Sequence, residues 1–470
     1  MAYTIEQKPN QLAGANSPMV FVLKEDTSAI FNADKFRYIA QVYISTTDAS
    51  TWVERAKIKI HKNSANVGIV DVNKIVRSYL ETQEQNVGNQ EIIAGSIHSI
   101  GISDTSNSYS QNTSQVVGVK LVGGYEKASS STAAPEETLN QANTIIYSIP
   151  ASTPYTDTGT NVGGLDIDGT NNPLTNYMPS GATKKFLTNA PRVQFVRGSS
   201  TAADNIDELT IAFINDGLIT DGDVIVKIAI EYYNKTGGQI GATKFFTIDT
   251  GSGGKATADD VKNSLLYFGC GTANLQNQVD EPDNQPSDFA DWAYYLIYGA
   301  DGSGGQKTDK YYFYRYGATR TGIDDRHQSC TRYDNVRLAW RNRLGAWDYM
   351  NFRGKSTESV DITRSDAGSV PGTWDSATFT YNNWDRGKKT LYTEATRKLT
   401  INSDWLNDDE GAWLEELFTS TNVQILADNN VVYPVVITDK RFTKKTSVNN
   451  KIKIQYTVNL EYANKVRTNS

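Results

Sequence analysis

Apolar and polar residues alternate with a period of two over many short stretches of the chain, and turn residues separate these stretches. Three runs rich in β-branched and aromatic residues occupy 19–24, 36–45 and 55–62, and the last two of them alternate in this way. A second series follows later in the chain, at 192–197, 208–216, 223–234, 243–249, 292–300 and 310–317. Its separators, such as NDG and TGG, suit tight hairpin turns. The pattern predicts antiparallel strands packed as β-sandwiches.

Two stretches show helical periodicity instead. Residues 70–81 carry apolar residues at helical spacing, and Asp71 can cap the start of that helix. In the second stretch, 402–420, Asn407 and Glu410 have the spacing of a capping box. The apolar stripe of this second helix consists of Trp413, Leu414, Leu417 and Phe418. Three strand signals follow it, which predicts a small sheet crossed by one helix.

These elements predict a mainly β, multi-domain chain. Its 470 residues exceed what one hydrophobic core normally supports. Residues 1–126 are expected to form a β-rich domain with one short helix, and 127–185 a polar linker or arm rich in Ser, Thr, Gly and Asn. A β-sandwich is predicted for 186–355, and a small α+β domain for 356–470.

The segment NVRLAWRNRLGAWDYMNF, residues 335–352, gathers large aromatic residues around a single glycine. Alternation places most of the rings on buried faces, and Gly345 suits a left-handed turn position. We interpret the segment as a structural hairpin in which Trp340 and Trp347 are mainly packed. A platform of exposed aromatic rings that binds a ligand is the alternative.

Composition and charge narrow the possible functions. The formal net charge is -7, and no basic footprint of the kind that nucleic-acid binding requires is present. No apolar run approaches 18 residues, and the N-terminus lacks the features of a signal peptide, so we expect no membrane insertion. The two cysteines, Cys270 and Cys330, do not make a disulfide scaffold, and whether they pair stays open.

Signals of catalytic chemistry are few. The three histidines are scattered and carry no recognised motif, so we predict neither an enzyme nor a cofactor. Paired carboxylates of the kind that glycosidases use remain open, because they need not be close in sequence. One loop, DIDGTNN, resembles the start of a calcium-binding loop. Its candidate ligands are Asp166, Asp168, Asn171 and Asn172. It lacks the distal glutamate of an EF-hand, and Asx turns explain the same residues without metal.

Several segments, taken in order, resemble virion structural proteins of tailed bacteriophages from environmental and gut phages. They are FRYIAQVYI, GIVDVNKIVRSYLE, FLTNAPRV, CTRYDNVRLAWRNRLGAWDYMNF, SDWLNDDEGAWLEEL and VVYPVVITDKRF. The resemblance runs from about residue 18 to 463. The hairpin segment is its most specific part, and 127–185 falls outside it. No catalytic residue comes with this family.

The resemblance implies a tail, tail-tip or baseplate ring protein that acts through subunit–subunit interfaces. Its expected partners are further copies of itself in a symmetric ring, with threefold or sixfold symmetry preferred, and other tail or neck proteins. The expected location is the virion, assembled in the host cytoplasm. A carbohydrate-binding adhesin module is the alternative. An enzyme, the third possibility, would need a cleft with a close carboxylate pair and one raised pKa.

Overall fold

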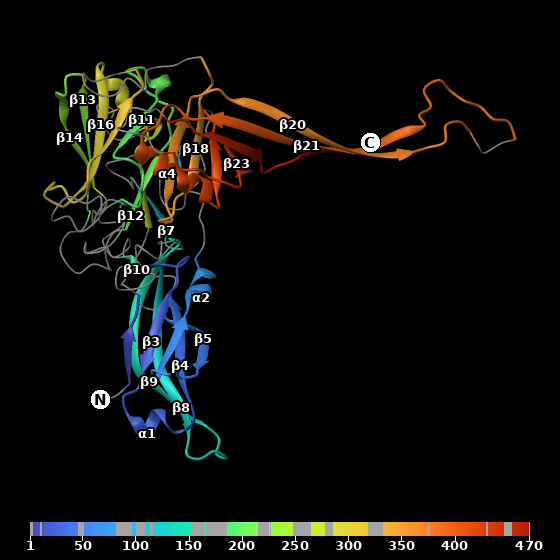
Figure 1. Ribbon diagram of the computed structural model, residues 1–470. Helices are drawn as coiled ribbons and strands as arrows, with labels where there is room; N and C mark the ends of the chain where they lie inside the picture. Colours follow the sequence, from blue (N-terminus) through green and yellow to red (C-terminus); the bar gives the residue numbers. More distant parts are fainter. Residues whose placement is uncertain are drawn as a thin grey trace. The chain divides into compact units, whose positions relative to one another are not determined.

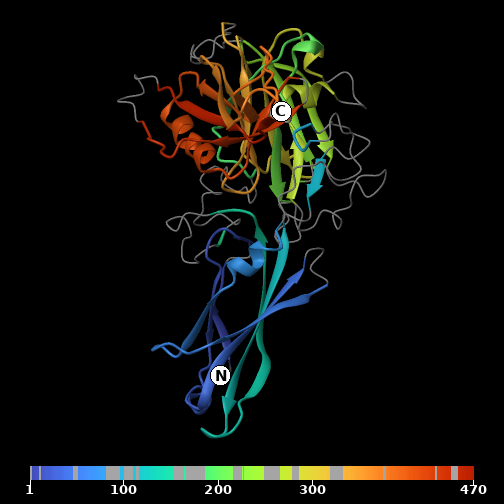
Figure 2. The ribbon, with the colours of Figure 1, turned by 90° about the vertical axis from the view of Figure 1, so that its right-hand side faces the viewer.

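The chain is mainly β, with several antiparallel sheets and few helices, which confirms the predicted fold class (Figures 1 and 2). The structure is a computed structural model. It describes residues 3–9, 12–45, 51–80, 96–99, 109–112, 116–152, 164–165, 186–214, 225, 227–247, 265–277, 285–317, 332–373, 377–428, 431–445 and 454–469.

Two compact units make up the chain. The first comprises Met1–Gln328 and Arg341–Asp348, and the second comprises Ser329–Trp340 and Tyr349–Ser470. Eight residues that surround a hairpin turn therefore belong to the first unit, although the residues before and after them belong to the second. This division differs from the predicted boundary at 355, because the hairpin strands join the C-terminal sheet.

An N-terminal β-sandwich opens the first unit. One sheet has the order β1-β3-β6, with β1 at Thr4–Gln7, β3 at Val20–Lys24 and β6 at Val67–Asp71. The other has the order β10-β2-β9-β8-β4-β5. Its strands are β2 (Leu12–Gly14), β4 (Asp34–Ser45), β5 (Val53–Ile60), β8 (Val117–Ala128), β9 (Glu136–Ile149) and β10 (Gly164–Leu165).

Apolar side chains of the two sheets share one core. Phe21 and Leu23 of β3 are fully buried in the same cluster as Tyr38 and Val42 of β4 and Val119 of β8. Alternation places these residues on the inner faces, as the sequence pattern predicted for β3 and β4.

The helix predicted over 70–81 is shorter than expected. It is α2, Asn73–Arg77, and Asp71 ends strand β6 because it pairs with Val20 of β3. The Asp71 carboxylate still accepts a hydrogen bond from the backbone N of Asn73, 3.0 Å away. A second short helix, α1 at Ser28–Phe31, makes two helices here instead of one.

The predicted linker over 127–185 is wrong in its first part. Residues up to Ala128 complete β8, and β9 pairs antiparallel with β8 from Val117 opposite Ser148 to Lys127 opposite Glu136. The polar first half of β9 conceals the strand, since only its end, TIIYSI, is apolar. Residues 153–163 and 166–185 lie outside the described residues.

The second β-sandwich of the first unit also has two sheets. Their orders are β11-β17-β16-β13-β14 and β12-β15-β7. The strands of the five-stranded sheet are β11 (Val193–Val196), β13 (Lys227–Asn234), β14 (Gln239–Thr247), β16 (Trp292–Ala300) and β17 (Tyr311–Arg315). The other sheet consists of β7 (Tyr109–Asn112), β12 (Thr210–Ile214) and β15 (Leu265–Gly269), and α3 (Thr272–Gln276) follows β15.

Aromatic rings join these two sheets. Phe246 of β14 lies 5.7 Å from Phe268 of β15, measured between ring centroids. Phe186 lies between Phe213 of β12 and Tyr311 of β17, at 6.2 Å and 5.5 Å. The contacts explain how a tyrosine-rich and methionine-poor sequence fills a core between sheets.

The C-terminal sheet has the order β19-β18-β22-β23-β24-β21-β20, and β25 pairs with β21. Its strands are β18 (Val336–Arg341), β19 (Trp347–Phe352), β20 (Thr357–Gly368), β21 (Lys388–Asn402), β22 (Val423–Leu426), β23 (Val432–Ile437), β24 (Thr457–Tyr462) and β25 (Val466–Asn469). One helix, α4 at Asp408–Thr419, accompanies it.

The capping box predicted for α4 is confirmed. The Asn407 side chain accepts a hydrogen bond from Glu410 N, and the Glu410 carboxylate accepts one from Asn407 N, both at 2.7 Å. Trp413, Leu414 and Leu417 are buried, as the apolar stripe predicted. The sheet and its helix therefore form the predicted α+β arrangement.

Candidate functional site

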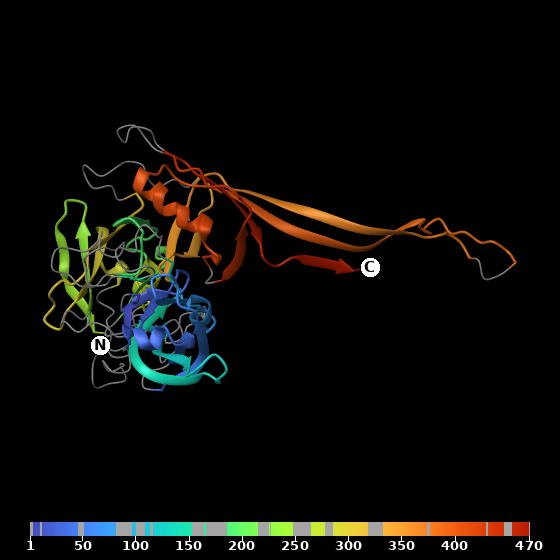
Figure 3. The same cartoon turned by 60° about the horizontal axis from the view of Figure 1, so that its bottom comes forward.

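Strands β20 and β21 form a long two-stranded ribbon, which we call the arm together with the turn between them (residues 357–402). The two strands pair from Thr357 opposite Thr400 to Gly368 opposite Lys388. Figures 1 and 3 show the ribbon running out beyond the other strands of the C-terminal sheet. The sequence did not predict these two strands, because charged and small polar residues occupy two thirds of their positions.

Exposed apolar side chains concentrate on the arm. Seven of its large apolar residues have exposed fractions between 47% and 78%: Val360, Ile362, Val370, Phe379, Tyr381, Trp384 and Leu391. Single exposed apolar residues are ordinary on a protein surface, whereas a group of them on one element marks an interaction surface. The arm is therefore the main candidate for contact with another chain.

One face of the C-terminal sheet is covered by helix α4. On this face Trp340 of β18, Val423 of β22 and Val435 of β23 are in register and buried. The ring of Trp413 in α4 lies against Trp340, with centroids 4.8 Å apart. The helix and this face of the sheet thus share an apolar core.

The same face continues along the arm but becomes exposed there. Leu460 of β24 and Leu399 of β21 are paired on it and buried. Four residues along β21, Ala395 is paired with Ile362 on one side and Val466 on the other. Ile362 is 51% and Val466 55% exposed. The arm thus extends the core-facing side of the sheet past the part that α4 covers.

The opposite face of the arm is polar and carries ion pairs. Lys398 Nζ lies 2.5 Å from a carboxylate oxygen of Asp361 on the neighbouring strand. On the same face, Lys465 Nζ lies 3.2 Å from a carboxylate oxygen of Glu394, which is paired with Thr363. Such exposed pairs contribute little stability, so this face behaves as an ordinary solvated surface.

The predicted hairpin of 335–352 is formed by β18 and β19. Trp340 is 0% and Trp347 2% exposed. The Trp347 ring meets the buried ring of His98 edge-on, 4.8 Å between centroids, and the Arg341 guanidinium lies 5.3 Å from it. His98 itself lies in a turn. Because both indoles are enclosed, neither offers a ring face to a ligand.

Polar residues that sequence analysis missed fix the hairpin turn. The Asn342 side chain accepts hydrogen bonds from Leu344 N and Ala346 N at 3.0 Å each. Its amide donates to Asp348 at 3.0 Å, and the Thr188 hydroxyl donates to the same carboxylate oxygen at 2.6 Å. The turn is therefore held by buried hydrogen bonds as well as by its aromatic strands.

Replacing Gly345 with valine is expected to destabilise the protein by roughly 1–3 kcal/mol. Gly345 has φ +86°, and a Cβ atom there would lie 3.0 Å from Pro150. Urea unfolding measures the loss. Gly368→Val is the matched control, because a Cβ atom at Gly368 would meet nothing within 4 Å. Equal stability of the two variants would contradict the assigned role of the turn.

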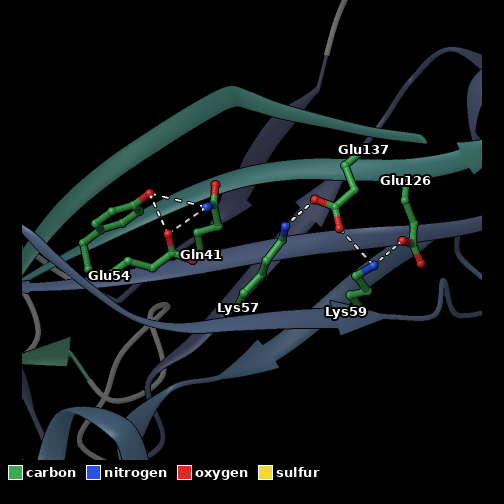
Figure 4. A network of polar contacts seen from close by, with 7 residues as sticks. Gln41, Glu54, Lys57, Lys59, Glu126 and Glu137 are labelled. Atoms are coloured by element: carbon green, nitrogen blue, oxygen red, sulfur yellow. Dashed lines mark hydrogen bonds and ion pairs between the residues drawn. The ribbon is translucent and has the colours of Figure 1, made fainter. Parts of the chain in front are cut away.

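A close carboxylate pair lies on the six-stranded sheet of the N-terminal sandwich (Figure 4). Glu126 of β8 and Glu137 of β9 are directly opposite. Lys59 bridges them at 2.5 Å and 2.9 Å, and Lys57 contacts Glu137 as well. Hydrogen bonds from Lys57 and then Lys59 lower the pKa of Glu137. A glycosidase acid needs a raised pKa, and the pKa of Glu137 is shifted in the opposite direction.

A row of aromatic residues crosses the five-stranded sheet of the second sandwich. Tyr233, Tyr294 and Tyr314 lie on adjacent strands in register. Their rings stack at 4.9 Å and 4.7 Å, with interplanar angles of 3° and 24°. Stacked rings cover one another's faces, and Tyr294 and Tyr314 are buried. The row therefore differs from the open, coplanar platform that sugar binding requires.

Glu231 lies beside this row with a full set of partners. Its carboxylate accepts hydrogen bonds from Tyr233 at 2.7 Å, Tyr298 at 3.0 Å and Thr243 at 3.2 Å, and Lys310 lies 3.6 Å away. Burial raises the pKa of Glu231, but the hydrogen bond from Tyr233 and the charge of Lys310 outweigh it and lower the pKa. A general acid needs a raised pKa, so the lowered pKa of Glu231 and its three hydrogen bonds give it the role of a structural link between neighbouring strands.

The candidate calcium ligands Asp166, Asp168, Asn171 and Asn172 lie outside the described residues, and so does Cys330. Cys270 is buried. Among the residues that the structure describes, no group of three or more His, Cys, Asp or Glu side chains could hold a metal ion. In the same part of the chain, no helix has the length and apolar character that crossing a membrane requires.

Comparisons with known proteins give little guidance. No family model and no curated protein matches the chain. Among solved structures, trypsin-activated alpha-2-macroglobulin from Escherichia coli is 10% identical, with a TM-score of 0.18 over 85% of this chain and 19% of that one. A Salmonella alpha-2-macroglobulin mutant is 7% identical, with a TM-score of 0.18 over 99% of this chain and 30% of that one. The chain thus spans less than a third of either protein, and scores this low carry no argument.

Proposed function

We propose that the chain is a structural component of a tailed-bacteriophage virion, a tail, tail-tip or baseplate protein that acts through subunit–subunit interfaces. The observation that carries this proposal is the arm: the face of the ribbon that bears Val360 and Ile362 continues the core side of the sheet, and both side chains are exposed within the described structure. The sequence resemblance to virion proteins supports the virion as the setting. The partners proposed are further copies of the chain in a ring and other tail or neck proteins.

The physical argument concerns the stability of a two-stranded ribbon. Such a ribbon is at best marginally stable in water, because it buries little apolar surface of its own. When a neighbouring subunit covers an apolar residue of the arm, the free energy of association becomes more favourable by about 25 cal/mol for each Å² of apolar surface removed from water. Contact with a neighbouring subunit therefore stabilises both the arm and the assembly, which is how structural proteins of symmetric particles use extended segments.

Removing the distal arm is expected to abolish assembly without unfolding the body of the protein. The variant lacks residues 365–392 and joins Arg364 to Thr393 through Asn-Gly, the residues of a tight hairpin turn. Native mass spectrometry should find a closed oligomer for the intact chain, with threefold or sixfold symmetry preferred, and smaller species for the variant.

Thermal unfolding controls for the integrity of the shortened chain, whose melting temperature should stay close to that of the intact protein. Antibody labelling of purified tailed particles tests the location. A monomeric intact chain, found in one copy per particle or absent from particles, would contradict the proposal. Equal assembly of both forms would show that the distal arm is not the interface.

Hydrolysis of host glycans or peptides is not expected. The close carboxylate pair Glu126–Glu137 is neutralised by lysines, and Glu231 is saturated with donors. Incubation of the purified chain with cell-wall glycans, followed by reducing-end and mass analysis, measures any turnover. Turnover that disappears when one Asp or Glu is replaced would overturn this expectation. Tight glycan binding without assembly would favour the adhesin alternative.

A further inference from the structure

The outer edge of the arm is a second possible contact, separate from its tip. In the described part of the chain, β20 pairs with β21 alone, so its other edge presents unpaired backbone groups. All residues from 357 to 364 are exposed. Natural edge strands are often protected by lysine, proline or other charged residues; β20 contains neither lysine nor proline, and its charged residues are Glu358, Asp361, Arg364 and Asp366.

The sequence of this edge is self-complementary when it is read in both directions from Asp361. In an antiparallel pair of two β20 strands centred on Asp361, Glu358 faces Arg364 and Val360 faces Ile362. Ser359 then faces Thr363, and Thr357 faces Ser365. Directly opposite residues in antiparallel strands share a face, so each pair matches in kind: acid with base, β-branched apolar with apolar, hydroxyl with hydroxyl.

We propose that two copies of the chain join edge to edge through β20, antiparallel, about a twofold axis at Asp361. The contact is isologous, and every pair except the Asp361 pair on the axis is made twice. On the apolar face, Val360 of one copy extends the row of Ile362, Ala395 and Val466 of the other. The inference goes beyond the proposed function, because it requires two copies of this chain and no virion partner.

One pair at the axis opposes the contact. The two Asp361 carboxylates meet on the polar face, where like charges directly opposite are unfavourable. Lys398 Nζ lies 2.5 Å from the Asp361 carboxylate within each copy. The axis therefore carries two neutral ion pairs side by side. Because the two copies of residue 361 face each other at the axis, a substitution at this position tests the register of the two strands directly.

Disulfide trapping tests the register. Opposite Cα atoms in antiparallel strands are about 4.5–5.5 Å apart, which lies within the range of a disulfide bond. Asp361→Cys should therefore form a covalent dimer under mild oxidation. Thr363→Cys is the matched control on the same face. Its two copies would be offset by four residues, roughly 13 Å along the strands, too far to bond. The unmodified chain controls for Cys270 and Cys330.

Charge reversal tests the pairing chemistry without new cysteines. Glu358→Arg places two bases opposite each other, and Arg364→Glu places two acids opposite each other. Each single reversal acts twice by symmetry and should weaken dimerisation about tenfold, measured by sedimentation. The double variant Glu358→Arg/Arg364→Glu restores both pairs and should restore dimerisation. Lys389→Glu, on the strand away from this edge, should leave it unchanged.

Two results would overturn the proposal: equal trapping of Asp361→Cys and Thr363→Cys, or a double reversal as weak as either single one. Both experiments alter residues that the distal deletion retains. A chain that trapped at position 361 but formed no larger assembly would support the edge contact and count against the proposed function. A larger assembly without trapping at position 361 would support the proposed function and count against the edge contact.

Discussion

Replacing Trp347 with alanine is expected to lower the free energy of unfolding by about 3–5 kcal/mol. The indole is 2% exposed and packs edge-on against the buried ring of His98. Its removal leaves a cavity that the surrounding hydrogen-bonded turn cannot readily fill, because Asn342 and Asp348 hold the backbone on both sides. Urea unfolding followed by circular dichroism measures the loss.

Two further substitutions serve as comparisons for the stability loss of Trp347→Ala. Trp384→Ala removes an indole that is 78% exposed, so its effect should stay within about 0.5 kcal/mol. Trp347→Phe should cost less than the alanine variant, since the Trp347 indole nitrogen forms no hydrogen bond within the described structure. An unchanged melting temperature for Trp347→Ala together with lost glycan binding would mean that the hairpin is a binding site.

Replacing Asp207 with alanine is expected to cost about 3–5 kcal/mol, because it removes the buried carboxylate that pairs with a largely buried arginine. The fully buried Asp207 carboxylate accepts hydrogen bonds from Arg197 Nε at 2.7 Å and from Arg197 N at 2.8 Å. Equilibrium unfolding in urea measures the effect. Two further variants provide reference values for this loss of stability.

Glu6→Ala breaks the exposed pair with Lys24 and should change the free energy of unfolding very little. The double variant Arg197→Met/Asp207→Leu should be more stable than Asp207→Ala, because it removes both charges from the interior. A double variant no better than Asp207→Ala would show that the loss comes from packing rather than from the broken ion pair.

Local patterns predicted the elements whose signals lie within a few residues. Asn407 and Glu410 identified the start of α4, and Gly345 identified the hairpin turn, because each depends on its nearest neighbours. The strands around Tyr38 and Tyr294 were equally clear, because they are rich in β-branched and aromatic residues. These predictions required no knowledge of long-range pairing.

The sequence did not reveal which strands pair when they lie far apart in the chain. Strand β18 joins the C-terminal sheet through β22, with Leu338 opposite Ile425, and nothing local to either strand indicates that partner. The arm was missed for a related reason. A strand that is exposed on both faces has no need of apolar alternation, so β20 reads as a polar loop. The candidate interface therefore emerged only when the strands were placed in register.

The division of the chain between its two units has a consequence for the order of synthesis. Residues 341–348 belong to the first unit, although twelve residues of the second, Ser329–Trp340, precede them. A ribosome that has released residue 328 has therefore delivered an incomplete first unit, still without Trp347 to pack on His98. The first unit can be completed only after the chain has begun the second, and no single cut separates two whole folding units.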